Sequence, residues 1–109
     1  MTPGLISIIT PVFNRADLLV ETVESVLKQS YRNWQLIIVD DNSNHETIEV
    51  IENLRRRDWR LHLHVKSEND VKGPACSRNL GVHRAEGEFV VYLDSDDLLF
   101  PHCLEQRID

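Results

Sequence analysis

Four short apolar stretches recur at similar intervals along the chain. They cover Leu5–Val12, Trp34–Asp40, Leu61–Val65 and Phe89–Leu93. Their length and their β-branched and aromatic residues favour strands over helices. Three of them are almost continuously apolar, which is typical of strands buried on both faces. Leu61–Val65 instead alternates apolar and polar residues, which predicts a strand with one wetter face at a sheet edge.

Between these strands, apolar residues recur at the spacing of helices. The predicted helices run from about Arg15 to Ser30, from Ser43 to Arg57, from Pro74 to Ala85, and onward from Pro101. Asn14 is a candidate N-cap for the first helix. Ser43 and Glu46 have the S-x-x-E spacing of a capping box and predict the start of the second.

The alternation of strands and helices predicts an α/β fold, a Rossmann-like parallel sheet with helices on both faces. Right-handed crossovers and the commonest strand order for such a unit predict the order 3-2-1-4. The 109 residues contain no repeat or linker, so we expect residues 1–109 to form one domain. The sequence stops soon after the helix start at Pro101, which leads us to expect a piece of a longer protein.

Composition narrows the class of protein. A net charge of −6 and a pI of about 5.3 argue against a nucleic-acid partner. The Arg55–Arg57 run is explained by a solvated helix end. Cys76 and Cys103 form no C-x-x-C, and no apolar run approaches 18 residues. We therefore expect a cytoplasmic protein, including one bound peripherally at the cytoplasmic face of a membrane.

Acidic residues gather where the predicted strands end. The second strand ends in Asp40–Asp41, and Asp94–Ser95–Asp96–Asp97 follow the fourth. On spacing alone, a solvated acidic turn is the commoner explanation. In the predicted order, however, both ends flank the first strand roughly 10 Å apart, at the edge where open α/β sheets bind ligands. This span suits a nucleoside diphosphate, with a divalent cation bridging Asp96 to phosphate oxygens and an acid free to accept a base N–H.

Three common motifs are missing from the chain. It has no G-x-G-x-x-G after the first strand, no G-x-x-x-x-G-K-[ST] and no G-x-S-x-G. These absences disfavour a dinucleotide-binding protein, a P-loop protein and an α/β-hydrolase.

Four segments together carry a family resemblance. They are SIITPVFNR at Ser7–Arg15, ESVLKQSYRNWQLIIVDDNS at Glu24–Ser43, GPACSRNLG at Gly73–Gly81 and GEFVVYLDSDDLLFP at Gly87–Pro101. The chain resembles the nucleotide-binding half of the family 2 inverting glycosyltransferases, which have the GT-A fold. The resemblance spans about Leu5 to Leu104.

The resemblance implies roles for residues at the strand ends. Thr10 and Pro11 would line the nucleotide pocket. Asp41, with Asp40 beside it, would read the base, usually uracil. Arg78, on the third helix, would face the nucleotide.

A metal site is implied at the fourth strand end. Asp94 and Asp96 match the D-x-D motif of the family. Asp96 would be the direct ligand of Mn²⁺ or Mg²⁺, and Asp94 would lie nearer the ribose and sugar. Asp97 is assigned no role.

The implied activity belongs to polysaccharide or lipid-linked glycan biosynthesis. A sugar would pass from a nucleotide-diphosphate sugar, a UDP-sugar by expectation, to an acceptor hydroxyl with inversion. The resemblance places the catalytic base beyond Asp109, so we expect no catalytic base in this chain and little transfer by it alone. The alternative is a non-catalytic nucleotide-binding or interaction module.

A haloacid-dehalogenase-like phosphatase is ranked low, because its Asp-x-Asp would follow the first strand rather than the fourth. An uncovered fourth strand would expose an apolar edge and favour self-association.

Overall fold

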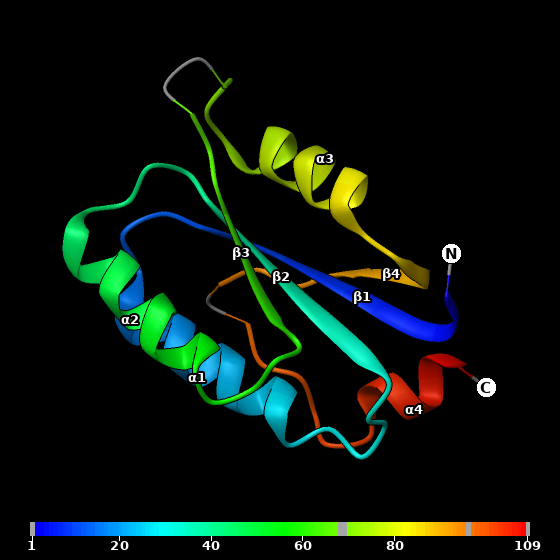
Figure 1. Cartoon of the computed structure of the whole chain (residues 1–109). Helices are drawn as coiled ribbons and strands as arrows, with labels where there is room; N and C mark the ends of the chain where they lie inside the picture. The colour runs from blue at the N-terminus through cyan, green and yellow to red at the C-terminus, as the bar shows by residue number, and fades with distance from the viewer. Residues whose placement is uncertain (1, 68–69, 96, 109) are drawn as a thin grey trace.

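The computed structural model describes residues 2–67, 70–95 and 97–108. In chain order the elements are β1 (Thr2–Val12), α1 (Ala16–Leu27), β2 (Trp34–Asp40), α2 (His45–Arg55), β3 (Leu61–Val65), α3 (Pro74–Arg84), β4 (Gly87–Tyr92) and α4 (Cys103–Ile108) (Figure 1). No helix among these residues is both long enough and apolar enough to cross a bilayer.

All the strand pairings are parallel, and the sheet has the order β3-β2-β1-β4. The α/β class and the predicted strand order are therefore confirmed. The carboxyl ends of β2 and β4 flank the carboxyl end of β1, because both strands pair with β1. β2 and β3 lie on one side of β1, and β4 lies on the other. The strand order therefore reverses at β1, and the carboxyl edge of the sheet beside β1 is the topological switch point.

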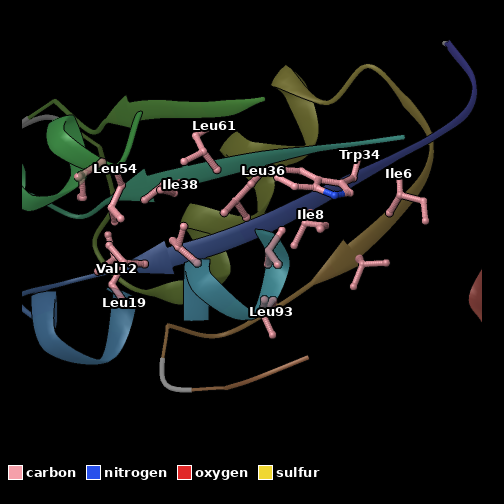
Figure 2. Close-up of a cluster of buried hydrophobic side chains, with 14 of the residues drawn as sticks. Ile6, Ile8, Val12, Leu19, Trp34, Leu36, Ile38, Leu54, Leu61 and Leu93 are labelled. Carbon is pink, nitrogen blue, oxygen red and sulfur yellow. The ribbon is translucent and has the colours of Figure 1, made fainter. Parts of the chain in front are cut away.

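Two layers of helices cover the sheet (Figure 1). On one face, α1 and α2 pack over Ile8, Leu36 and Ile38 of the central strands, as Figure 2 shows. On the other face, α3 covers Ile9 and Ile37, each at most 2% exposed. Because β2 lies between both layers, all seven of its residues are buried.

The fourth strand departs from its prediction. Val91 and Leu93 are buried at 5% exposure, but Val90 and Tyr92 are 41% and 54% exposed. The prediction that this strand is buried on both faces is wrong. β4 lies at the end of the sheet with β1 as its one strand neighbour, and the main packing of α3 is against β1 and β2.

The two predicted helix caps are also wrong. Asn14 adopts φ 50° and donates its backbone N–H to Ser43 Oγ, while its Oδ1 accepts from the Asn44 backbone N–H. The N-cap of α2 is Asn44, whose Oδ1 accepts from the Thr47 N–H, and α1 has no side-chain cap. The predicted capping side chains instead join the loops that follow β1 and β2.

Candidate functional site

A hollow of about 290 Å³ lies at the carboxyl edge of the sheet. Its lining residues are Pro11, Val12, Phe13, Arg15, Asp41, Ser77, Arg78, Asp94 and Ser95. They come from the ends of three strands and from the first turns of α3. The parallel topology thus brings together residues that lie far apart in the sequence.

Four of the predicted site residues line this hollow: Pro11, Asp41, Arg78 and Asp94. Thr10 does not line it, although it immediately precedes Pro11. Its side chain is fully buried, and its Oγ1 has no hydrogen-bond partner among the described residues.

Asp40 does not line the hollow either. It is fully buried, and its Oδ2 accepts the backbone N–H of Ser43 at 2.8 Å. Its Oδ1 is buried without a hydrogen-bond partner in the described part of the chain. In this structure Asp40 holds the turn that follows β2, and a contact between Asp40 and a ligand stays a prediction.

Asp41 lines the hollow and is itself mostly buried, with 9% of its surface exposed. Its Oδ2 accepts the Gly73 backbone N–H at 2.8 Å. Its Oδ1 lies 3.4 Å from the Lys66 ammonium nitrogen. Gly73 has φ 112°, a conformation that side chains rarely adopt, so glycine suits this contact. An acid fixed in this way can accept a further N–H from a ligand in the hollow.

Arg78 and Asp94 also line the hollow and form an ion pair. An Arg78 Nη lies 3.3 Å from Asp94 Oδ1, and the two side chains are 37% and 50% exposed. The guanidinium also lies 5.9 Å from the centre of the Tyr92 ring. A solvated pair of this kind holds its partners weakly, so both groups are available to a charged ligand.

The acidic segment after β4 is held against α1. The hydroxyl of Thr22 lies 2.8 Å from the Ser95 carbonyl oxygen and 2.7 Å from the Asp97 carbonyl oxygen. The Asp97 N–H also donates to the Asp94 carbonyl at 3.0 Å. Asp96, the predicted direct metal ligand, lies outside the described residues.

The Asp94 carboxylate supplies the hard oxygen that Mn²⁺ or Mg²⁺ prefers, at the rim of the hollow. No cluster of three metal-binding side chains occurs within residues 2–67, 70–95 and 97–108. A Mg²⁺-like ion in a phosphate site commonly takes one or two carboxylates together with phosphate oxygens and waters. The residues present therefore fit an ion that binds together with a diphosphate.

The sequence reasoning did not name five of the lining residues as site residues, nor did it name Lys66: the five are Val12, Phe13, Arg15, Ser77 and Ser95. Phe13 is 50% exposed beside the hollow, with the Lys72 ammonium 5.6 Å from its ring centre. Arg15 also lines the hollow. Phe13 and Arg15 both lie in the SIITPVFNR segment, and this motif is the signal from which they could have been predicted. Lys66, which follows β3, gave no signal, because a lysine at a strand end is usually solvated.

Comparison with known proteins identifies the family. The profile of "Glycosyl transferase family 2" matches residues 7–109. The chain belongs to glycosyltransferase family 2. The family 2 chain is 40% identical to an uncharacterized glycosyltransferase of Haemophilus influenzae, over 100% of this chain and 43% of that protein. It is 37% identical to the UDP-Glc:alpha-D-GlcNAc-diphosphoundecaprenol beta-1,3-glucosyltransferase WfgD of Escherichia coli, over 99% of this chain and 41% of that protein.

Solved structures show the same fold. TarS 1-349 of S. aureus in complex with UDP-GlcNAc matches with a TM-score of 0.80 and 32% identity, covering 94% of this chain and 29% of that one. The mannosyltransferase PcManGT of Pyrobaculum calidifontis, in complex with GDP-Man and Mn²⁺, matches with a TM-score of 0.74 and 27% identity, covering 85% of this chain and 28% of that one. The family 2 chain thus spans less than half of the length of these relatives and has the GT-A arrangement of its structural neighbours.

Proposed function

We propose that the hollow binds a nucleoside-diphosphate sugar and that the protein transfers its sugar to an acceptor hydroxyl with inversion. The carrying observation is that Asp41 and the Arg78–Asp94 pair line one hollow at the switch point, with Asp41 after β2 and Asp94 after β4, the two strands that flank β1. An acid that accepts a base N–H and a cation that faces phosphates are what a nucleoside diphosphate requires. The donor is proposed to be a UDP-sugar, since one structural neighbour is a complex with UDP-GlcNAc.

Each group has a distinct part in the proposed reaction. Asp41 holds the base, while Pro11 and Phe13 supply apolar surface beside it. Asp94 and Asp96 would hold Mn²⁺ or Mg²⁺, which when bound neutralises negative charge on the diphosphate. Arg78 releases Asp94 and donates to the phosphates, which stabilises the charge that grows as the diphosphate leaves.

The acceptor hydroxyl must lose a proton as it attacks the sugar. Two of the lining residues, Asp41 and Asp94, are carboxylates, and both are assigned to the donor. We therefore place the base outside the hollow. The acceptor is proposed to be a glycan or a lipid-linked glycan, because two relatives are named as transferases that act on diphosphoundecaprenol-linked saccharides. A lipid-linked acceptor would bring the protein to the cytoplasmic face of a membrane as a peripheral partner.

Calorimetric titration with UDP, with Mn²⁺ and with chelator, tests the donor site. We expect Mn²⁺-dependent binding that weakens by about tenfold or more in Asp94→Asn and Asp96→Asn, since each removes a charge from the metal site. Glu49→Gln removes an exposed charge from α2 and serves as the control. Binding that survives both chelator and Asp96→Asn would overturn the metal role. No binding of UDP under any condition would overturn the proposed function.

A transfer assay separates an enzyme from a binding module. UDP release from UDP-glucose and UDP-GlcNAc is measured with and without a diphosphoundecaprenol-linked N-acetylhexosamine. Acceptor-dependent release supports transfer. Binding without release, in a protein that includes the segment with the proposed base, favours the non-catalytic module. Phosphate release from a phosphomonoester would point to a phosphatase instead.

A further inference from the structure

Lys66 is a buried lysine with a complete set of partners. Its side chain has 0% exposure. Its ammonium donates to the Val71 carbonyl at 2.9 Å and to the Gly73 carbonyl at 3.1 Å, and it lies 3.4 Å from Asp41 Oδ1. Its backbone N–H donates to the Asp40 carbonyl, which continues the pairing of β2 with β3. Three segments therefore meet at one ammonium: the end of β2, the end of β3 and the turn before α3.

A buried ammonium is costly unless charge and hydrogen bonds offset its lost hydration. A methionine at this position would fill similar space without that cost. The partners of Lys66 show what the lysine supplies. Its charge lies beside Asp41, and its hydrogen bonds fix the two carbonyls of the turn that presents the Gly73 N–H to the same carboxylate.

We propose that Lys66 is the positioning residue for the base end of the site. It pairs with the Asp41 carboxylate and ties it to the turn 71–73, so that Asp41 is held ready for the base. This inference rests on the proposed function, because it takes Asp41 as the acid that reads the base.

The contact also links the two ends of the site. The Gly73 carbonyl, which accepts from Lys66, also accepts from the N–H and the hydroxyl of Ser77 in the first turn of α3. Arg78 is the next residue. The ammonium of Lys66 therefore helps to fix the start of the helix that presents the arginine.

A double-mutant cycle tests the proposal. Lys66→Met is expected to lower the affinity for both uridine and UDP by about tenfold or more, because a buried carboxylate loses its counter-ion. Asp41→Asn is expected to cause a similar loss. In the Asp41→Asn background, Lys66→Met should change the affinity for uridine by less than about twofold, since the carboxylate that it positions is already gone. Lys28→Met removes an exposed lysine at the end of α1 and should leave the affinity unchanged.

Hydrogen exchange at the Gly73 amide gives a readout without nucleotide. We expect exchange to speed up in Lys66→Met by about tenfold or more, because the Asp41 acceptor is no longer held in place. In Lys28→Met it should match the wild type. Lys66→Gln, which loses the charge but keeps donor groups, is the second variant if Lys66→Met fails to fold.

The outcomes separate this proposal from the proposed function. A wild type that binds neither uridine nor UDP refutes the proposed function, and Gly73 exchange then still decides whether Lys66 holds Asp41. Unchanged exchange in both Lys66 variants overturns the proposal. The proposal is also overturned if Lys66→Met lowers the affinity for uridine equally in the wild type and in the Asp41→Asn variant. An equal loss would show a general effect on the fold.

Discussion

Three buried side-chain oxygens have no hydrogen-bond partner within the described parts of the chain: Thr10 Oγ1, Asp40 Oδ1 and Asp41 Oδ1, the last of which forms the ion pair with Lys66 at 3.4 Å. Most buried polar atoms in native proteins are paired, so such a group calls for an explanation. All three lie at the carboxyl ends of β1 and β2, beside the hollow. Unused hydrogen-bonding capacity at this edge is what a site for a polar ligand requires, and it is a cost that a purely structural edge would avoid.

Arg78→Ala tests which end of the ligand the arginine serves. We expect the affinity for UDP to fall by about tenfold, because a charge-assisted hydrogen bond to phosphate is lost, and the affinity for uridine to stay unchanged. Calorimetry with both ligands measures the difference. Arg84→Ala removes an exposed arginine from the same helix and serves as the control. An equal loss for uridine would place Arg78 at the base instead.

At the scale of elements, α3 positions Ser77 and Arg78 in the site because it packs directly on β1. Gly81 makes this close approach possible. A Cβ at Gly81 would lie 2.4 Å from Ile9 Cγ2, closer than side chains tolerate. The helix that carries Arg78 is therefore held near the sheet by the lack of a side chain at one position.

Gly81→Ala should push α3 away from the sheet. We expect a loss of about 1–3 kcal/mol in the free energy of unfolding, as overpacking commonly costs, together with weaker UDP binding. Urea denaturation measures the first. Adding Ile9→Ala should recover part of the loss, because it removes the clashing atoms, whereas Val82→Ala on the exposed side of α3 should have little effect. Additive losses in the double variant would contradict the packing argument.

The turn between α2 and β3 is held by Asp58 and Arg60. Hydrogen bonds from the Arg60 side chain lower the pKa of the Asp58 carboxyl, with a smaller contribution from the Arg60 backbone N–H. The same guanidinium stacks on the Trp34 ring at 3.8 Å, so the pair is packed against the core. A carboxyl with a lowered pKa stabilises the fold above its unfolded pKa and loses this effect as the pH falls through its folded value.

Asp58→Asn should therefore destabilise the protein in a pH-dependent way. At pH 7 we expect a loss of about 1 kcal/mol in the free energy of unfolding. The difference from wild type should shrink below about pH 4, because the wild-type carboxyl is then protonated as well. Thermal unfolding at several pH values measures it, with Glu49→Gln as the exposed control. A difference that is constant down to pH 2 would show that charge plays no part.

At the scale of the whole molecule, the two edges of the sheet differ. β3 ends one edge and β4 the other, with Phe89, Val90 and Tyr92 exposed along β4. An exposed apolar edge strand is a template for pairing with another chain. We therefore expect self-association through β4.

Val90→Lys should weaken this self-association, because a charge on an edge strand opposes pairing. Sedimentation velocity over a range of concentrations measures it. Val65→Lys on β3 is the matched control, because the exposed fractions of the two valines are similar: 46% for Val65 and 41% for Val90. A wild type that stays monomeric at every concentration, or equal effects of the two variants, would contradict the role of β4.

The sequence by itself determined the elements and the order of the sheet. β2 and β3 occupy the residues that were predicted for them. Their boundaries follow from the local pattern, because each is a short apolar run or alternation bounded by polar residues. The strand order followed from the alternation of strands and helices, since few topologies satisfy short right-handed connections. That topology was enough to place Asp41, Arg78 and Asp94 at one edge.

Only the tertiary structure decided which of these residues are exposed and what each contacts. Burial depends on which distant elements cover a strand, so the apolar run of β4 gave no warning that one face is open. Asn14 and Ser43 have the local signals of caps, yet they bond across two loops that are adjacent only in the fold. Lys66 is the clearest case: its burial and its contact with Asp41 arise where β2, β3 and the turn before α3 converge. No spacing along the chain encodes that convergence.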